Sequence, residues 1–216
     1  MSGPQFGWLW LIANPILLAA CFVLLRALFV RKPEVRSSWA EQLVGIMDGF
    51  SQGLLHLVKW FALAMVLITV ALVLGRYVFG VGSLKGQETV IYLHALLFLL
   101  ASGATLLRNG HVRVDIFYSG LSARNKAVVD FAGTLLFLVP VCLLILVYSQ
   151  SYVALAWKFH EGSAEADGLP WVYLLKTAIP AFAILMLLQG SAQALRAALQ
   201  LVGQPMPAIQ SDKEML

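Results

Sequence analysis

The sequence has 216 residues, of which 60% are hydrophobic and 12% are charged, and its formal net charge is +4. A soluble domain carries about 25% charged residues and needs a large polar surface, so this composition excludes an ordinary soluble domain. It predicts a protein with several membrane-spanning helices. The positive charges flank apolar runs, so they indicate membrane topology rather than a nucleic-acid surface.

The first apolar run covers residues 7–30. At about 1.5 Å per residue it is long enough to cross a bilayer of roughly 30 Å. Basic residues follow it, so we expect the chain to start outside and to enter the cytoplasm here. Pro15 in mid-run leaves open the alternative of a segment lying flat or re-entering. No basic region precedes the run, so we expect it to remain in the mature protein. We therefore assign residues 1–38 to an extra N-terminal transmembrane helix and a basic linker.

Residues 39–58 differ in kind from the runs around them. Apolar residues such as Leu43, Phe50 and Leu54 recur at three- and four-residue spacing, and polar residues such as Asp48 and His56 fall largely elsewhere. This pattern predicts an amphipathic helix. It fits a helix lying along the cytoplasmic membrane interface and a helix packed on protein about equally well.

The predicted transmembrane core of four helices covers residues 59–201. Its first helix is predicted over the apolar run 60–75 and ends with Arg76 and Tyr77. We expect these two residues to anchor at the lipid headgroups. A short external turn at residues 80–86 leads to Glu88. We expect this carboxylate to open the second helix and to favour its dipole.

A polar hinge at residues 108–115 separates two of the longest apolar runs, 89–107 and 131–157, which contain no Asp, Glu, Lys or Arg. Such runs belong in lipid, so the hinge belongs at a membrane surface, and its cations place that surface in the cytoplasm. We expect its polar side chains to form a hydrogen-bonded cluster at the headgroups or against a partner. These side chains are Arg108, His111, Arg113 and Asp115.

The third core helix is expected at about residues 123–157, with Ser122 as its N-cap and a possible bend at Pro140. An acidic external loop, 158–170, follows. The fourth helix, 171–201, returns to the cytoplasm, and residues 202–216 are expected to be a disordered tail. Asp130 and Lys176 lie near helix interiors, where anchoring or pairing with a neighbouring subunit is the favoured interpretation.

Small residues predict where helices approach closely in lipid. One patch covers residues 101–105, and a second recurs every four residues at Gly190, Ala194 and Ala198. We expect both faces to meet other helices.

The distribution of charge tests this topology. Eleven of the 15 Lys and Arg residues fall in segments assigned to the cytoplasm. This bias predicts five crossings with a periplasmic N-terminus and a cytoplasmic C-terminus. The expected fold is an all-α integral membrane protein with a four-helix transmembrane core, an extra N-terminal transmembrane helix and an amphipathic interfacial helix.

The sequence contains no familiar catalytic or metal-binding motif, such as a phosphate-binding glycine loop, HExxH or CxxC. We therefore expect no enzyme activity, no cofactor and no metal. His56, His94 and His111 leave one alternative, a haem-binding membrane anchor subunit of an oxidoreductase. A structural membrane protein with an unknown partner is a third possibility.

Several motifs together carry a family resemblance. They are Arg76-Tyr-Val-Phe79, Glu88 near a helix start, Gly110-His-Val-Arg-Val-Asp115, and Gly168-Leu-Pro-Trp171 with Ile179-Pro180. Over about residues 60–196 the chain resembles the small membrane subunit of tripartite ATP-independent periplasmic (TRAP) transporters, the DctQ family. The chain departs from the family at 85–88, where Lys-Gly-Gln-Glu replaces Trp-x-Glu-Glu, so only the second carboxylate remains.

The resemblance implies a non-catalytic scaffold in a bacterial inner membrane. Its implied partners are a large polytopic permease subunit, a periplasmic solute-binding protein and membrane phospholipids, with uptake of an organic acid or similar small solute driven by a sodium gradient. The candidate partner or membrane contacts are Arg76, Tyr77, Glu88, Arg108, His111, Arg113, Asp115, Glu161 and Lys176.

Overall fold

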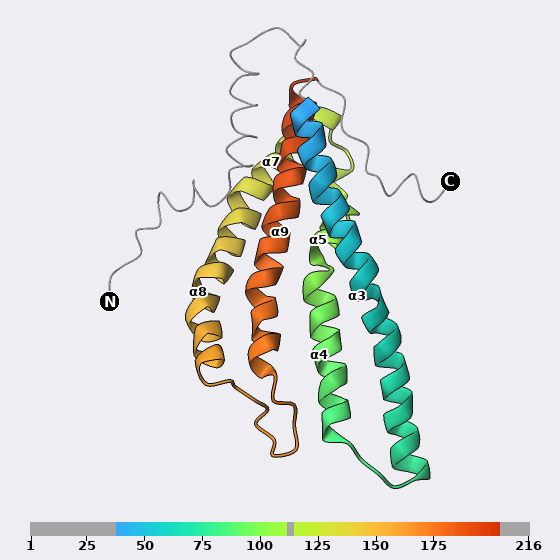
Figure 1. Ribbon diagram of the computed structural model, residues 1–216. Helices are drawn as coiled ribbons and strands as arrows, with labels where there is room; N and C mark the ends of the chain where they lie inside the picture. The colour runs from blue at the N-terminus through green and yellow to red at the C-terminus, as the bar shows by residue number, and fades with distance from the viewer. Residues whose placement is uncertain (1–37, 112–114, 204–216) are drawn as a thin grey trace. The chain divides into compact units, whose positions relative to one another are not determined.

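The computed structural model describes residues 38–111 and 115–203, and every element in these ranges is helical (Figure 1). The predicted N-terminal helix at 7–30 and most of the predicted tail lie outside the described residues. The elements are α3 (Ser38–Val78), α4 (Leu84–Leu100), α5 (Ser102–Leu107), α6 (Asp115–Tyr118), α7 (Ala123–Gly133), the π-helix η1 (Thr134–Leu138), α8 (Val139–Lys158) and α9 (Val172–Leu201).

Within the described part of the chain, three helical stretches are long and apolar enough to cross a membrane. They are Ala40–Val78, Ala123–Phe159 and Val172–Leu201. Helix α4 has 17 residues and ends at Leu100, ahead of the short α5. The all-helical class is therefore confirmed, while the four-helix transmembrane core with an added helix stays a prediction.

Helix boundaries differ from expectation in two places. The predicted division between an amphipathic helix ending at residue 58 and a spanning helix falls inside α3, which runs unbroken to Val78. The second predicted helix, 89–107, starts earlier, at Leu84, and is interrupted at Ala101. Ser83 caps it, because its hydroxyl accepts the Gly86 N–H at 3.2 Å.

Ser122 caps α7 as predicted, since its Oγ accepts the Asn125 N–H at 3.3 Å. The helix then passes through the π-turn η1, which ends at Leu138, two positions before Pro140. A proline lacks an N–H and cannot complete the regular ladder, and a π-turn is one way in which a helix accommodates that loss.

The chain divides into two compact units. Of the described residues, the first unit comprises 38–51, 103–111, 115–143 and 186–203, and the second comprises Gln52–Ser102 and Leu144–Leu185. The core of the first unit joins Ala40 and Val44 of α3 to Leu195 and Leu199 of α9, with Phe131 packed against them. Each helix contributes two residues four positions apart, which lie on one helix face.

The predicted small-residue face of α9 lies in this first unit and is buried. Ala194 and Ala198 are fully buried, and Gly190 is buried against η1. A Cβ at position 190 would lie 2.7 Å from Leu138 Cδ2, so only glycine permits this approach without movement of Leu138. The prediction that this face meets another helix is confirmed.

Candidate functional site

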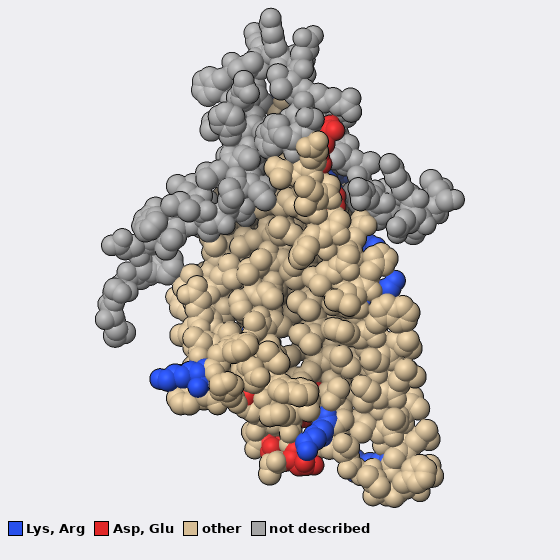
Figure 2. Space-filling view, in the orientation of Figure 1, with Lys and Arg blue, Asp and Glu red and all other residues tan. Residues whose placement is uncertain are grey.

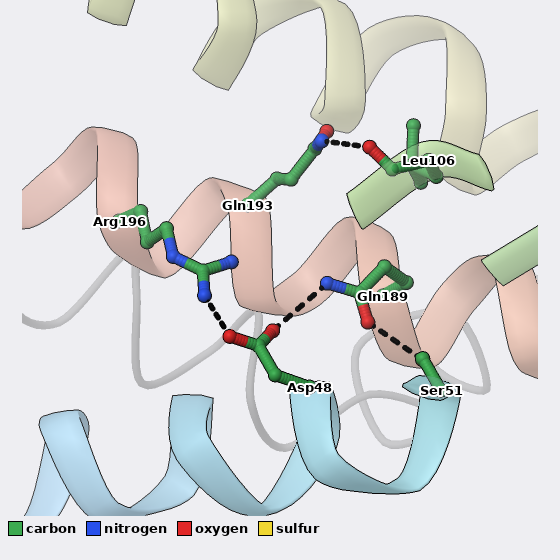
Figure 3. Close-up of polar contacts among 6 residues, drawn as sticks. All are labelled: Asp48, Ser51, Leu106, Gln189, Gln193 and Arg196. Carbon is green, nitrogen blue, oxygen red and sulfur yellow. Dashed lines mark hydrogen bonds and ion pairs between the residues drawn. The ribbon is translucent and has the colours of Figure 1, made fainter. Parts of the chain in front are cut away.

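A buried polar network in the first unit links α3 to α9 (Figure 3). Arg196 Nη2 donates to Asp48 Oδ2 in an ion pair, and Gln189 Nε2 donates to Asp48 Oδ1 at 3.1 Å. Ser51 Oγ donates in turn to Gln189 Oε1 at 2.7 Å. Both carboxylate oxygens of Asp48 therefore have donors from α9.

The network is removed from solvent. Asp48 is 1% exposed and Arg196 is 5% exposed. A buried ion pair gains little net stability over apolar residues of the same size, but removing one partner leaves a buried charge unpaired and costs about 3–5 kcal/mol. The network therefore fixes which face of α3 contacts which face of α9, more than it adds to overall stability.

A second polar contact ties α9 to α5 in the same unit. Gln193 Nε2 donates to the carbonyl oxygen of Leu106 at 2.8 Å (Figure 3). Ala104 and Leu107, on the same short helix, are 1% exposed. The small-residue patch at 101–105 was predicted to meet another helix. Its part within α5 is largely buried.

Sequence reasoning missed this network, although a signal for it was present. Gln189, Gln193, Arg196 and Gln200 recur at spacings of four, three and four along an otherwise apolar helix, which places them on one face. The sequence predicts Asp48 on the polar face of an amphipathic helix, and Arg196 counts only among the basic residues of the predicted cytoplasmic segments. The contacts of Asp48 correspond to the second alternative for residues 39–58, packing on protein.

In the second unit, Glu88 of α4 holds the loop between α8 and α9. Its Oε1 accepts the hydroxyl of Ser163, and its Oε2 accepts the N–H of Leu169 at 2.5 Å. The Ser163 N–H also donates to the Leu169 carbonyl at 2.9 Å, which closes the loop on itself. A Cβ at Gly168 would lie 2.8 Å from Glu88 Oε1, so the loop needs glycine there.

These contacts correct the role expected for Glu88. Helix α4 begins at Leu84 and has no acidic residue in its first turn, so Glu88 does not open the helix or cap its dipole. Two hydrogen bonds lower the pKa of Glu88 below its ordinary value. The bond from the Leu169 N–H has the larger effect, and the bond from the Ser163 hydroxyl has the smaller one. Glu88 precedes the apolar run that starts at Thr89, outside the segment expected to cross the membrane.

Glu161 and Lys176, both predicted as contact residues, pair with each other. Lys176 Nζ lies 2.7 and 2.6 Å from the two carboxylate oxygens of Glu161 and 3.9 Å from the ring centroid of Tyr152. Lys176 is only 14% exposed. The pair joins the start of the loop to α9, and the edge-to-face contact of Trp157 with Tyr173 packs beside it.

Further charged groups surround this loop. Lys85 Nζ lies 2.8 Å from Asp167 Oδ1, in an exposed ion pair. In the space-filling view of Figure 2, acidic and basic atoms gather beside the loop, whereas most of the visible helix surface is uncharged. Exposed pairs contribute little to stability, so the loop is held mainly by Glu88 and by the largely buried Lys176.

The other predicted contact residues are less constrained. Arg76 and Tyr77 close α3 and are exposed, as are Arg108 and His111 after α5. Arg113 and the side chain of Asp115 lie outside the described part of the chain. The predicted cluster of the hinge therefore stays a prediction.

The histidines on which the haem alternative depended are exposed. His56 is exposed, and its Nδ1 lies 3.1 Å from Lys59 Nζ. His94 and His111 are also exposed. Among the described residues, no three His, Cys, Asp or Glu side chains are grouped so that they could hold a metal ion.

The described elements are all helices, and three helical stretches are long and apolar enough to cross a membrane, which defines an all-helical membrane protein. A sequence model of the family described as "Tripartite ATP-independent periplasmic transporters, DctQ component" matches residues 65–200, well over half of the chain. The chain therefore belongs to the DctQ family, the small permease subunits of TRAP transporters. No curated protein and no solved structure matched it.

Proposed function

We propose that this protein is the non-catalytic scaffold subunit of a TRAP transporter that imports an organic acid or a similar small solute. In this proposal, a large polytopic permease subunit moves the solute, a periplasmic binding protein delivers it, and a sodium gradient drives uptake. Membership of the DctQ family, over residues 65–200, is the observation that carries the proposal.

The polar contacts of both units support a bracing role. Several described carboxylates have partners within the chain, among them Asp48 with Arg196, Glu161 with Lys176, Asp167 with Lys85, and Glu88 with the α8–α9 loop. A solute or ion path needs polar groups that can exchange partners with what passes. Groups committed to internal pairs instead hold helices in fixed contact, which suits a subunit that steadies a moving partner.

We place the protein in a bacterial inner membrane, with the N-terminus in the periplasm and the hinge at 108–115 in the cytoplasm. The excess of Lys and Arg in the predicted cytoplasmic segments supports this orientation. It puts the loop held by Glu88 on the periplasmic side, where a binding protein would approach.

Co-purification and reconstitution test the function. The full chain, expressed with a large TRAP permease subunit from the same organism, is expected to remain bound to that subunit in mild detergent. Liposomes that hold both subunits should accumulate solute when the binding protein and an inward sodium gradient are present, and liposomes that hold the large subunit alone should not. Uptake by this chain alone, or full uptake without it, would contradict the scaffold role.

Cysteine labelling tests the orientation. The variants Gly110→Cys and Ala164→Cys place one thiol in the hinge and one in the exposed α8–α9 loop. In intact spheroplasts, a membrane-impermeant maleimide should label position 164 and should reach position 110 only after lysis. The reverse pattern would invert the topology.

The hinge cluster is also part of the proposal. Arg113→Ala and Asp115→Ala are each expected to reduce the yield of the two-subunit complex or its transport. Arg124→Ala, a nearby exposed cation outside the hinge, is the matched control. If both hinge variants assemble and transport like the control, residues 113 and 115 have no role in holding the partner.

A further inference from the structure

The first unit contains a cleft of about 270 Å³ beside the buried network. Polar side chains from α6, α7 and α9 line it, among them Tyr118, Lys126, Asp130, Arg196 and Gln200. Pockets for drug-sized ligands usually measure about 300–1,000 Å³. This cleft therefore suits a compact polar group rather than a whole lipid or a large solute.

Two cations, Lys126 and Arg196, line the cleft. Arg196 is 95% buried and donates to Asp48 through Nη2, but its Nε has no hydrogen-bond partner within the described residues. Lys126 Nζ lies 5.4 Å from the ring centroid of Tyr118 and forms no ion pair with a described residue. Both cations line the cleft, and hydrogen bonds between a cation and a charged acceptor are among the stronger ones, so an anionic acceptor in the cleft would be favoured.

The cleft also carries a negative charge. Asp130 lines it, and Asp130 Oδ2 accepts the hydroxyl of Tyr118 at 2.8 Å. With Asp48 behind Arg196, two positive and two negative side chains meet here, so the local charge is balanced. A bare anion would leave an uncompensated charge in a partly buried site. A zwitterion would keep the balance and could use both signs.

We infer that this cleft binds the phosphoethanolamine group of a zwitterionic phospholipid. The phosphate accepts a hydrogen bond from Lys126 and lies against the positively charged Arg196 guanidinium, and the ammonium group faces Asp130. Arg124, Asn125 and Lys126 make the first turns of α7 polar before the apolar stretch continues, so the cleft lies at the end of a spanning stretch. Lipid headgroups occupy that level of a membrane. Free phosphoethanolamine in solution carries the same phosphate and ammonium groups. The experiment therefore distinguishes the free molecule from the headgroup of a phospholipid.

The inference rests on the first unit alone and involves no transport measurement, so it can fail or succeed independently of the proposed function. The full chain is purified, stripped of lipid in detergent and mixed with one defined lipid, and retained lipid is counted by native mass spectrometry. Phosphatidylethanolamine should be retained in preference to phosphatidylglycerol, and both in preference to diacylglycerol, which lacks the phosphate.

Variants locate the site. Lys126→Gln should weaken retention of phosphatidylethanolamine by about tenfold, the effect of losing one charge-assisted hydrogen bond. Arg124→Gln is the matched control, because Arg124 is an exposed cation two residues away that does not line the cleft. Ala123→Trp should also reduce retention, because Ala123 lines the cleft and the larger ring fills it without any change of charge. If Lys126→Gln does not fold, Ala123→Trp decides the question.

Equal retention of phosphatidylethanolamine and diacylglycerol would overturn the inference, as would equal losses in Lys126→Gln and Arg124→Gln. Preference for phosphatidylglycerol would overturn the charge-balance argument. Free phosphoethanolamine is the last probe. If it displaces the bound lipid, the lipid is held through its phosphoethanolamine group. If it binds where the lipid does not, the ligand comes from the aqueous phase and the lipid assignment is wrong.

Discussion

Asp48 and Arg196 lie 148 positions apart in the sequence and form an ion pair in the interior of the first unit. Gln189 and Ser51 extend this pair, so the α9 face that presents Arg196 meets the α3 face that presents Asp48. Buried polar pairing of this kind admits one register between two helices, because any rotation would leave a charge without a partner. Within the first unit, the contact therefore holds the first part of α3, up to Ser51, against the last part of α9, from Met186 onward.

Arg196→Met is expected to lower the free energy of unfolding by about 3–5 kcal/mol, because it leaves the Asp48 carboxylate buried and unpaired. The double variant Asp48→Leu with Arg196→Met should recover most of this loss. Denaturant or thermal unfolding in detergent measures both. Arg108→Met, which removes an exposed cation, is the control, and an Arg196→Met protein as stable as that control would refute the argument.

Gly190→Ala should destabilise the protein by about 1–3 kcal/mol, the usual cost of overpacking. The added methyl group would meet Leu138 Cδ2 at 2.7 Å. Gly133→Ala is the matched control, since no atom lies within 4 Å of its added Cβ and alanine favours a helix. Leu138→Ala combined with Gly190→Ala should restore part of the loss. Equal melting temperatures for the two single variants would show that the α9 contact with η1 is not tight.

Glu88→Gln should loosen the α8–α9 loop, because an amide cannot accept both the Leu169 N–H and the Ser163 hydroxyl as the carboxylate does. Hydrogen–deuterium exchange of peptides that cover residues 161–170 should become faster, while exchange within α8 stays unchanged. Glu165→Gln removes an exposed carboxylate from the same loop and serves as the control. Unchanged exchange in Glu88→Gln would mean that other contacts hold the loop.

The contribution of Glu88 to the stability of the folded protein should depend on pH in the acidic range only. Its folded-state pKa is lowered by the Leu169 and Ser163 hydrogen bonds, so the stabilisation is complete above the unfolded glutamate pKa and is lost as pH falls through the lowered folded value. The difference in melting temperature between the native protein and Glu88→Gln should thus be constant from about pH 8 to 5 and shrink below about pH 4. A difference that grew on acidification would contradict the assignment.

Local sequence patterns predicted those features of the fold that depend only on residues close together in the sequence. The length of the apolar runs predicted long helices, Ser122 was recognised as a cap, and the four-residue repeat at Gly190, Ala194 and Ala198 predicted a buried face. The motifs around residues 76–115 and 168–180 were enough to suggest the DctQ family, which the match over residues 65–200 then established.

The tertiary structure alone decided which polar groups meet. Glu88 binds a backbone N–H that lies 81 positions further along the chain, and Asp48 pairs with a residue on the last helix. Helical periodicity gives the face on which a side chain lies, but not the face of the other helix that it contacts. That choice depends on the packing of several helices at once, so a polar residue that sequence analysis assigns to a surface can be the centre of a buried network.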